Sequence, residues 1–153
     1  MYQGNSLIII PSYNEAENIV DIINDVLIQK ESFHLLIVDD NSPDKTYELV
    51  EDEIIKNPKK IFLIKREKKS GLGTAYLEGF KWAIDNGYER IFEMDADYSH
   101  DPKDLLRMNV FLDNDGYDVV IGSRYVSGVN VVNWPIQRVL LSYFASILSL
   151  IHI

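Results

Sequence analysis

Cysteine is absent from this 153-residue chain. The sequence therefore excludes disulfides, zinc–thiolate centres and thiol catalysis, and the reducing cytosol is the simplest compartment for it. Basic residues are also few, with 15 Lys and Arg against 24 Asp and Glu and a net charge of −9. Nonspecific nucleic-acid binding needs a basic surface, so this composition argues against nucleic acid as a partner.

Charge is missing from the last part of the chain, where the 15 residues Val139–Ile153 include no Asp, Glu, Lys or Arg. A membrane span needs ~20 apolar residues, so this stretch is too short to cross a bilayer. Its serines recur at helical spacing, which is typical of a helix that packs on a core or lies in a membrane interface. We predict one domain over residues 1–132 and the start of an amphipathic interface helix over residues 133–153. The uncapped apolar end predicts a C-terminally truncated fragment.

Short apolar runs alternate with amphipathic helical patterns along the chain. The runs are continuous, as in strands buried on both faces, and cover Leu7–Ile10, Leu35–Val38, Ile61–Ile64, Ile91–Met94 and Val119–Ile121. The helical patterns cover Ala16–Leu27, Thr46–Lys56, Thr74–Ile84 and Leu105–Leu112. This alternation predicts an α/β sandwich with a mostly parallel central sheet. Ligands of such sheets bind beyond the carboxyl ends of the strands, so we looked for chemistry there.

Two acids, Asp95 and Asp97, follow the fourth run. Residues two apart in an extended segment point to the same side, so the two carboxylates converge. Because like charges repel, the pair indicates a cation, and carboxylate oxygens favour Mg²⁺ or Mn²⁺. Such an ion could neutralise charge on a departing diphosphate. The alternative is a pair of solvated turn acids, with Asp97 or Ser99 capping the next helix.

A second acid pair, Asp39 and Asp40, follows the second run directly. Adjacent strand residues point to opposite faces, so one acid can reach a ligand while the other binds neighbouring backbone. Acids at this place accept hydrogen bonds from ribose hydroxyls or base N–H groups. After the first run, Tyr13 can pack beside a base and Glu15 can accept from ribose. The alternative roles are local, since Asp39 and Asp40 can shape the turn and Glu15 can favour a helix N-terminus.

Basic residues gather between Lys59 and Lys69, directly before Gly71-Leu72-Gly73. The run predicts either a solvated face or a loop that faces an anion. Glycines allow close backbone approach to a ligand, but this pattern is neither a Walker loop nor a dinucleotide-binding fingerprint.

Candidate phosphate ligands follow the fifth run, at Ser123, Arg124 and Arg138. Arginine binds phosphate bidentately and stays charged. For Arg124 and Arg138 the alternative role is a structural ion pair.

Five segments that follow the apolar runs resemble, in order, the polyprenyl-phosphate (dolichol-phosphate) mannosyltransferases. These enzymes belong to the inverting family 2 glycosyltransferases of the GT-A fold. The resemblance covers about residues 7 to 147 and is carried by Pro11–Glu15, Val38–Asp44, Gly71–Tyr76, Asp95–His100 and Gly122–Tyr125. It implies a Rossmann-like GT-A sandwich over residues 1–132. It also implies transfer of a mannosyl residue from GDP-mannose to dolichyl or undecaprenyl phosphate, with inversion to the β-mannosyl phosphate.

The resemblance also implies roles for particular residues. The positions that match nucleotide-sugar-binding residues are Pro11, Tyr13, Glu15, Val38, Asp39, Asp40 and Asp95. Asp95 and Asp97 match the metal-binding motif, which implies Mg²⁺ or Mn²⁺, and Ser99 replaces a longer glutamine that touches the metal in many relatives. The positions that match ligands of the diphosphate or the acceptor phosphate are Ser123, Arg124 and Arg138. Asp95, Asp97 and Arg124 form the expected catalytic set.

A lipid monophosphate is already an anion near neutral pH, so it can attack the sugar C1 without a protein base. The implied partners are GDP-mannose, a polyprenyl phosphate and the cytoplasmic face of a membrane, with any anchoring segment or subunit outside this chain. Lys45 stands where relatives have glycine after Asp44, and we expect it to alter that turn.

Other functions remain open at this point. They are a family 2 transferase that uses another donor such as UDP-glucose, and an inactive module that binds a nucleotide sugar without turnover. A phospho-receiver domain fits poorly, because the third run ends in Lys65-Arg66 rather than in a phosphate-accepting acid.

Overall fold

The computed structural model describes residues 5–30, 32–114, 116–122 and 136–151. Contacts within the chain separate two units, Met1–Val120 and Ile121–Ile153, and each is described by itself. The domain boundary that we predicted after residue 132 lies outside the described residues.

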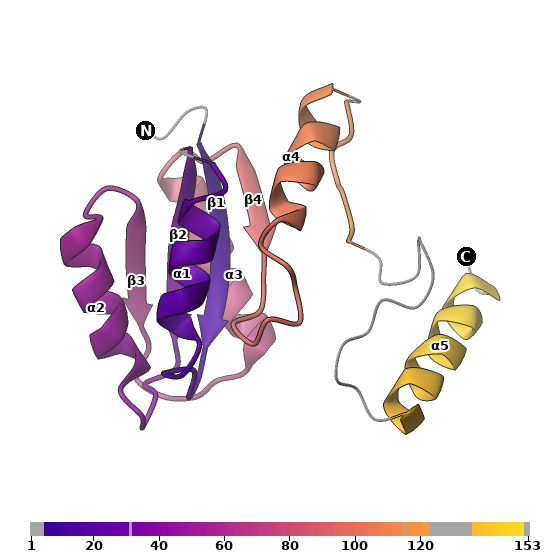
Figure 1. Cartoon of the computed structure of the whole chain (residues 1–153), viewed down its shortest axis with the longest axis horizontal. Helices are drawn as coiled ribbons and strands as arrows, with labels where there is room; N and C mark the ends of the chain where they lie inside the picture. Colours follow the sequence, from indigo (N-terminus) through magenta and orange to yellow (C-terminus); the bar gives the residue numbers. More distant parts are fainter. Residues whose placement is uncertain (1–4, 31, 115, 123–135, 152–153) are drawn as a thin grey trace. The chain divides into compact units, whose positions relative to one another are not determined.

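The first unit is built on a four-stranded sheet with the strand order β3-β2-β1-β4 (Figure 1). The strands are β1 (Ser6–Ser12), β2 (Phe33–Asp39), β3 (Ile61–Lys65) and β4 (Arg90–Glu93). Every pair of neighbouring strands is parallel, and Ile8 in β1 lies opposite Leu35 in β2 and Phe92 in β4. The predicted parallel sheet is therefore confirmed, and all four carboxyl ends point to one edge.

Four helices accompany these strands among the described residues of the first unit. They are α1 (Ile19–Leu27), α2 (Thr46–Lys56), α3 (Leu72–Asp85) and α4 (Asp104–Asn114). The prediction for α2 has the observed bounds, whereas α1 begins three residues after the predicted Ala16. The residues before α1 instead form a turn in which the backbone N–H groups of Asn18 and Ile19 both donate to the Glu15 carbonyl.

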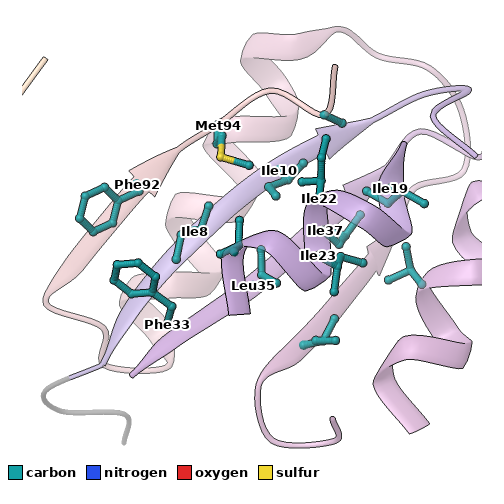
Figure 2. Packing of buried hydrophobic residues seen from close by; sticks show 14 of the residues in the cluster. Ile8, Ile10, Ile19, Ile22, Ile23, Phe33, Leu35, Ile37, Phe92 and Met94 are labelled. Atoms are coloured by element: carbon teal, nitrogen blue, oxygen red, sulfur yellow. The ribbon is translucent and has the colours of Figure 1, made fainter. Parts of the chain in front are cut away.

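The sheet buries apolar side chains on both faces, which explains the continuous apolar runs. On one face Ile8 and Ile10 of β1 pack with residues of α1, including Ile22 and Ile23, as Figure 2 shows. The core on that face also takes in residues of α2 and α4. Helix α3 covers the other face, where Ala75 and Ala83 join a second core with alternate residues of β1 and β2. In Figure 1, α1 lies in front of the sheet and α3 lies behind it.

Helix α3 approaches β1 closely at Gly79. A Cβ atom added to Gly79 would lie 2.7 Å from Cγ2 and 3.0 Å from Cδ1 of Ile9, a side chain that is fully buried. Glycine weakens a helix interior by about 1 kcal/mol relative to alanine. The close contact between helix and sheet explains why glycine stands here nevertheless.

The predicted fifth strand, Val119–Ile121, is not a strand. These residues have no regular secondary structure, and the side chains of Val119 and Ile121 are 73% and 83% exposed. The prediction rested on three consecutive apolar residues. A run this short forms a strand only when it pairs with a neighbour and buries its side chains, and these residues do neither.

The second unit contains α5 (Ile136–Ile151). Its exposed apolar residues are Ile136, Leu140, Leu141 and Phe144, which recur at the spacing of one helical face. Among the helices of the described residues, none is long and apolar enough to cross a membrane. The assignment of this region to a membrane interface stays a prediction.

Candidate active site

A cavity of about 270 Å³ lies at the carboxyl edge of the sheet, where the loops after β1, β2, β3 and β4 meet. Its walls are formed by Pro11, Ser12, Tyr13, Glu15, Val38, Asp40, Lys69, Gly71, Leu72, Ala75, Asp95, Ala96 and Asp97. The cavity therefore collects most of the nucleotide-sugar-binding residues that we predicted, as well as Asp95 and Asp97, two of the three predicted metal ligands.

The loop after β1 is held in place by the loop after β2. The backbone N–H of Asn14 donates to Ser42 Oγ at 3.1 Å, and that of Glu15 donates to Thr46 Oγ1 at 3.0 Å. The backbone N–H of Ala16 donates to Asp44 Oδ2 at 3.0 Å. These bonds give the backbone N–H groups of the loop their hydrogen-bond partners and so fix the positions of Tyr13 and Glu15 at the cavity.

Asp39 and Asp40 have different environments. Asp39 is completely buried and accepts hydrogen bonds from Ser12 Oγ at 2.8 Å, Ser42 N at 2.9 Å and Ser42 Oγ at 2.6 Å. It holds the loops together and is not among the residues that line the cavity. Asp40 does line the cavity. The role of Asp39 in nucleotide binding therefore stays a prediction that this geometry does not support directly.

Arg66 connects Asp40 to the basic loop. Its Nη1 lies 2.9 Å from Asp40 Oδ1 without hydrogen-bond alignment, so this contact is electrostatic. Arg66 Nη2 also donates to Thr74 Oγ1 at 2.6 Å, and the backbone N–H of Ser70 donates to Asp40 Oδ2 at 3.0 Å. The loop that leads into α3 is thus fixed against the cavity.

Lys69 is the residue of the basic run that reaches the cavity. Its Nζ lies 3.8 Å from the centroid of the Tyr13 ring, a cation–π contact. Lys65 instead contacts the Tyr47 ring at 3.2 Å, and Lys59 and Lys68 are exposed. One lysine of the basic run therefore faces the cavity and others are solvated. The prediction that this loop faces an anion stays a prediction.

Asp95 and Asp97 line the same cavity. Asp95 Oδ1 accepts from Tyr76 Oη at 3.3 Å, and the Asp95 backbone N–H donates to His100 Nδ1 at 3.2 Å. Asp97 Oδ1 accepts from the backbone N–H of Ser99 at 2.9 Å. Partial burial acts to raise the pKa of Asp97, but hydrogen bonds from Ser99 outweigh it and hold that pKa below its ordinary value. Asp97 is therefore an anion at neutral pH.

Glu15 faces these acids. Its burial raises its pKa, a hydrogen bond from Asn18 opposes the rise, and the charges of Asp97, Asp44 and Asp95 add to it. A cation or a ligand hydroxyl placed among these groups would relieve this repulsion.

The donor atoms fit a hard cation in part. The carboxylates of Asp95 and Asp97 line the cavity, while the described residues contain no group of three or more His, Cys, Asp or Glu side chains that could hold a metal ion. Oxygen atoms of the substrate and of water suit the remaining ligand positions of a bound Mg²⁺ or Mn²⁺. Ser99 donates its backbone N–H to Asp97 and does not line the cavity. Its role as a metal ligand stays a prediction.

The predicted phosphate ligands are not placed by this geometry. Ser123 and Arg124 lie outside the described residues. Arg138 belongs to α5, in the second unit, and its side chain is likewise not described.

Several lining residues escaped the sequence-based prediction. These are Ser12, Lys69, Leu72, Ala75 and Ala96, together with Gly71, which was assigned no role in the site. The signal for Lys69 was its place at the end of a basic run, next to Gly71. Leu72 and Ala75 lie in the segment Gly71–Tyr76, which carried part of the resemblance but was assigned no role in the site. They line the cavity through the first turn of α3.

The fold and the cavity define an α/β protein with an acid-lined cavity at the carboxyl edge of a parallel sheet, the edge at which such folds bind nucleotides. The chain belongs to glycosyltransferase family 2, since the family model described as "Glycosyl transferase family 2" matches residues 7–150.

Two curated relatives are similar over almost the whole chain. The chain is 44% identical over 144 residues to the polyprenol monophosphomannose synthase of Mycolicibacterium smegmatis, with 94% of this chain and 54% of that protein covered. It is 38% identical over 141 residues to the undecaprenyl-phosphate mannosyltransferase of Micrococcus luteus, with 92% and 57% covered. The resemblance to the polyprenyl-phosphate mannosyltransferases is thereby confirmed. The chain spans about half the length of these relatives.

A solved structure supports the fold. The crystal structure of S. aureus TarS, residues 1–349 in complex with UDP, matches with a TM-score of 0.65 and 26% identity. The match covers 86% of this chain and 38% of that chain. Together with the family match, it confirms the predicted GT-A fold.

Proposed function

We propose that this chain forms the donor-binding part of a polyprenyl-phosphate mannosyltransferase. The reaction is transfer of a mannosyl residue from GDP-mannose to a polyprenyl phosphate, with inversion to polyprenyl β-mannosyl phosphate. One observation carries the proposal. Glu15, Asp40, Asp95 and Asp97 converge on one cavity, in a chain that is 44% identical to a protein named polyprenol monophosphomannose synthase.

The nucleoside of the donor is assigned to the half of the cavity formed by β1 and β2. Pro11 and Val38 offer apolar surface to a base there, beside the Tyr13 ring. Asp40 and Glu15 accept hydrogen bonds from base N–H groups and ribose hydroxyls. The ammonium of Lys69 adds the positive charge that a diphosphate needs in a site otherwise rich in carboxylates.

Asp95 and Asp97 would hold Mg²⁺ or Mn²⁺ together with the donor diphosphate. When bound, the ion supplies positive charge that stabilises the departing nucleoside diphosphate. The protein's own part is to orient these carboxylates. Tyr76 donates to the Asp95 carboxylate, the Ser99 backbone donates to the Asp97 carboxylate, and His100 accepts from the Asp95 backbone N–H.

The acceptor brings its own nucleophile, because a phosphate monoester is an anion near neutral pH. Ser123, Arg124 and Arg138 are proposed to orient this phosphate for direct attack on C1 from the face opposite the leaving group. A single displacement inverts the anomeric centre. The apolar face of α5 is proposed to lie against the cytoplasmic face of a membrane, where the polyprenyl chain resides.

Calorimetric titration of the chain with GDP-mannose in the presence of Mn²⁺ tests this proposal. We expect saturable binding that chelation of the metal abolishes. Asp97→Asn removes the anion at constant size, so its affinity is expected to fall at least ~10-fold. Asp85→Asn is the matched control, because Asp85 is an exposed acid at the end of α3 and its change leaves the cavity intact. Equal binding by wild type and Asp97→Asn would contradict the proposed role of the acid pair.

A second donor class deserves a parallel titration, because the TarS structure was solved with UDP. Tight binding of UDP-glucose with no binding of GDP-mannose would assign this chain to family 2 transferases of another donor. Binding without release of nucleotide after addition of polyprenyl phosphate would identify an inactive nucleotide-sugar-binding module.

A further inference from the structure

Tyr98 has an unusual backbone conformation next to the acid pair. Its φ is 58°, in the left-handed region that bulky L-residues rarely enter. Such conformations persist when surrounding contacts hold them, and they gather at functional sites. The contact that can hold Tyr98 in this conformation is its hydrogen bond to Asp25.

The left-handed turn at Tyr98 shapes the acidic loop, residues 95–100. It turns the chain back so that the Ser99 N–H donates to Asp97 Oδ1 at 2.9 Å. On the other side of the loop, the Asp95 N–H donates to His100 Nδ1 at 3.2 Å. Both acids of the pair thus depend on the path of the chain through residue 98.

The Tyr98 side chain is tied to a helix far away in the sequence. Its hydroxyl donates to Asp25 Oδ2 at 3.0 Å, and Asp25 belongs to α1. Helix α1 is anchored in the core by Ile22, Ile23 and Val26, all fully buried. Tyr98 itself is partly exposed, so this hydrogen bond lies at the surface of the protein.

A second tyrosine holds the loop from the opposite face of the sheet. Tyr76 of α3 donates to Asp95 Oδ1 at 3.3 Å. Since α1 and α3 pack on different faces, the loop is fastened to two independent parts of the core. Of these two hydrogen bonds between the loop and the helices, the Tyr98–Asp25 bond is the closer in sequence to Asp97.

We propose that Tyr98 and Asp25 are positioning residues, which hold the acidic loop in the shape that directs Asp97 toward the cation and the donor diphosphate. The identity of the ligand in this inference rests on the proposed function. The shape of the loop is independent of the proposed function and can be measured in the metal-free protein.

The first test uses NMR on the 153-residue chain without metal or nucleotide. Tyr98→Phe and Asp25→Ala each remove the hydrogen bond, so we expect the Ser99 amide to shift and to exchange its proton with water at least ~5-fold faster. Asp25→Asn keeps an oxygen that accepts from Tyr98, and its Ser99 amide is expected to resemble wild type. Asp21→Ala is the charge control, since Asp21 lies one turn earlier on α1 and its charge also acts on Tyr98, whereas the Tyr98 hydroxyl donates to Asp25.

The second test measures the affinity for Mn²⁺ with GDP by calorimetry, together with the midpoint of thermal unfolding. We expect about 10-fold weaker binding in Tyr98→Phe and Asp25→Ala, and near wild-type binding in Asp25→Asn and Asp21→Ala. A purely structural role would lower the unfolding midpoint and leave the affinity of the folded protein unchanged.

The outcomes separate the inference from the proposed function. Wild-type Ser99 amide behaviour and wild-type affinity in Tyr98→Phe and Asp25→Ala would overturn the positioning role. If wild type binds no Mn²⁺ with GDP, the proposed donor site fails, and the Ser99 amide alone decides whether Tyr98 and Asp25 shape the loop. Should Asp25→Ala fail to fold, Tyr98→Phe provides the same comparison.

Discussion

Asp39 and Asp40 are neighbours in the chain, yet they contribute to the site in different ways. Asp39 joins the loops after β1 and β2 through Ser12 and Ser42, and Asp40 faces the cavity with Arg66 behind it. A buried carboxylate is stable only when several hydrogen-bond donors surround it, and the two aspartates obtain their donors from different groups. Asp39 obtains them from hydroxyl and backbone groups, whereas Asp40 relies partly on a guanidinium.

Lys45 has a left-handed backbone conformation, which is uncommon for a residue other than glycine. Its φ is 63°, in the left-handed region that glycine enters without steric cost. Thr46 follows as the first residue of α2. The expectation that Lys45 alters the turn found in relatives stays a prediction.

We predict that Lys45→Gly is more stable than Lys45→Ala. Both variants lose the exposed ion pair with Glu48, so their difference isolates the left-handed backbone, which glycine adopts without steric cost. The midpoint of thermal unfolding of Lys45→Gly is expected to be about 2–4 °C higher. Equal midpoints for the two variants in a thermal melt followed by circular dichroism would show that residue 45 carries no strain.

At the scale of elements, α3 combines two functions. Its first turn supplies Leu72 and Ala75 to the cavity, and its middle docks on β1 at Gly79. The close contact between Gly79 and Ile9 fixes the position of α3 on the sheet. The start of the helix, including Tyr76, therefore lies beside Asp95.

We predict that Gly79→Ala lowers the free energy of unfolding. Overpacking a close-packed core costs about 1–3 kcal/mol, and the gain in helix propensity recovers at most about 1 kcal/mol of that. The added Cβ would meet the fully buried Ile9 side chain, which has little room to move. Urea unfolding measures the difference.

Gly73→Ala is the matched control on the same helix. A Cβ atom at Gly73 meets nothing within 4 Å, so this variant is expected to be equally or more stable than wild type. If both alanine variants shifted stability by the same amount, close packing would not be the reason for glycine at position 79.

At the scale of the whole molecule, the two ends of the sheet have different chemistry. The carboxyl edge carries the acids of the cavity. Near the start of β2, His34 is buried and its Nδ1 lies 2.7 Å from Tyr88 Oη, among the rings of Phe62 and Trp82. Burial, aided by the nearby charge of Lys60, lowers the pKa of His34 below its ordinary value.

This lowered pKa predicts a pH dependence of stability. The unfolded chain binds a proton at His34 more readily than the folded protein does, so protonation favours unfolding. The contribution of neutral His34 is complete above its ordinary pKa of 6.5 and is lost as the pH falls through the lower pKa of the folded state. We expect urea midpoints to decline from pH 7 to pH 5.5, and to decline less in His34→Gln, which cannot take up this proton. Identical pH profiles for the two proteins would contradict the prediction.

Much of the fold follows from the sequence because burial on both faces of a parallel sheet demands continuous apolar runs. Runs such as Leu7–Ile10 and Leu35–Val38 became β1 and β2 with small changes at their ends. The run Val119–Ile121 had the same composition but forms no strand, because a strand requires a partner, and partners are chosen in three dimensions.

By itself, the sequence determined the parallel α/β architecture and the edge of the sheet where the acids gather. Period and composition alone decide which segments bury their side chains, and the carboxyl ends of parallel strands must share an edge. Only the tertiary structure decided that Asp40 rather than Asp39 faces the cavity, that Lys69 reaches Tyr13, and that Tyr98 is tied to Asp25. These contacts join residues from separate loops and helices, so they arise from packing between elements and leave no periodic signal along the chain.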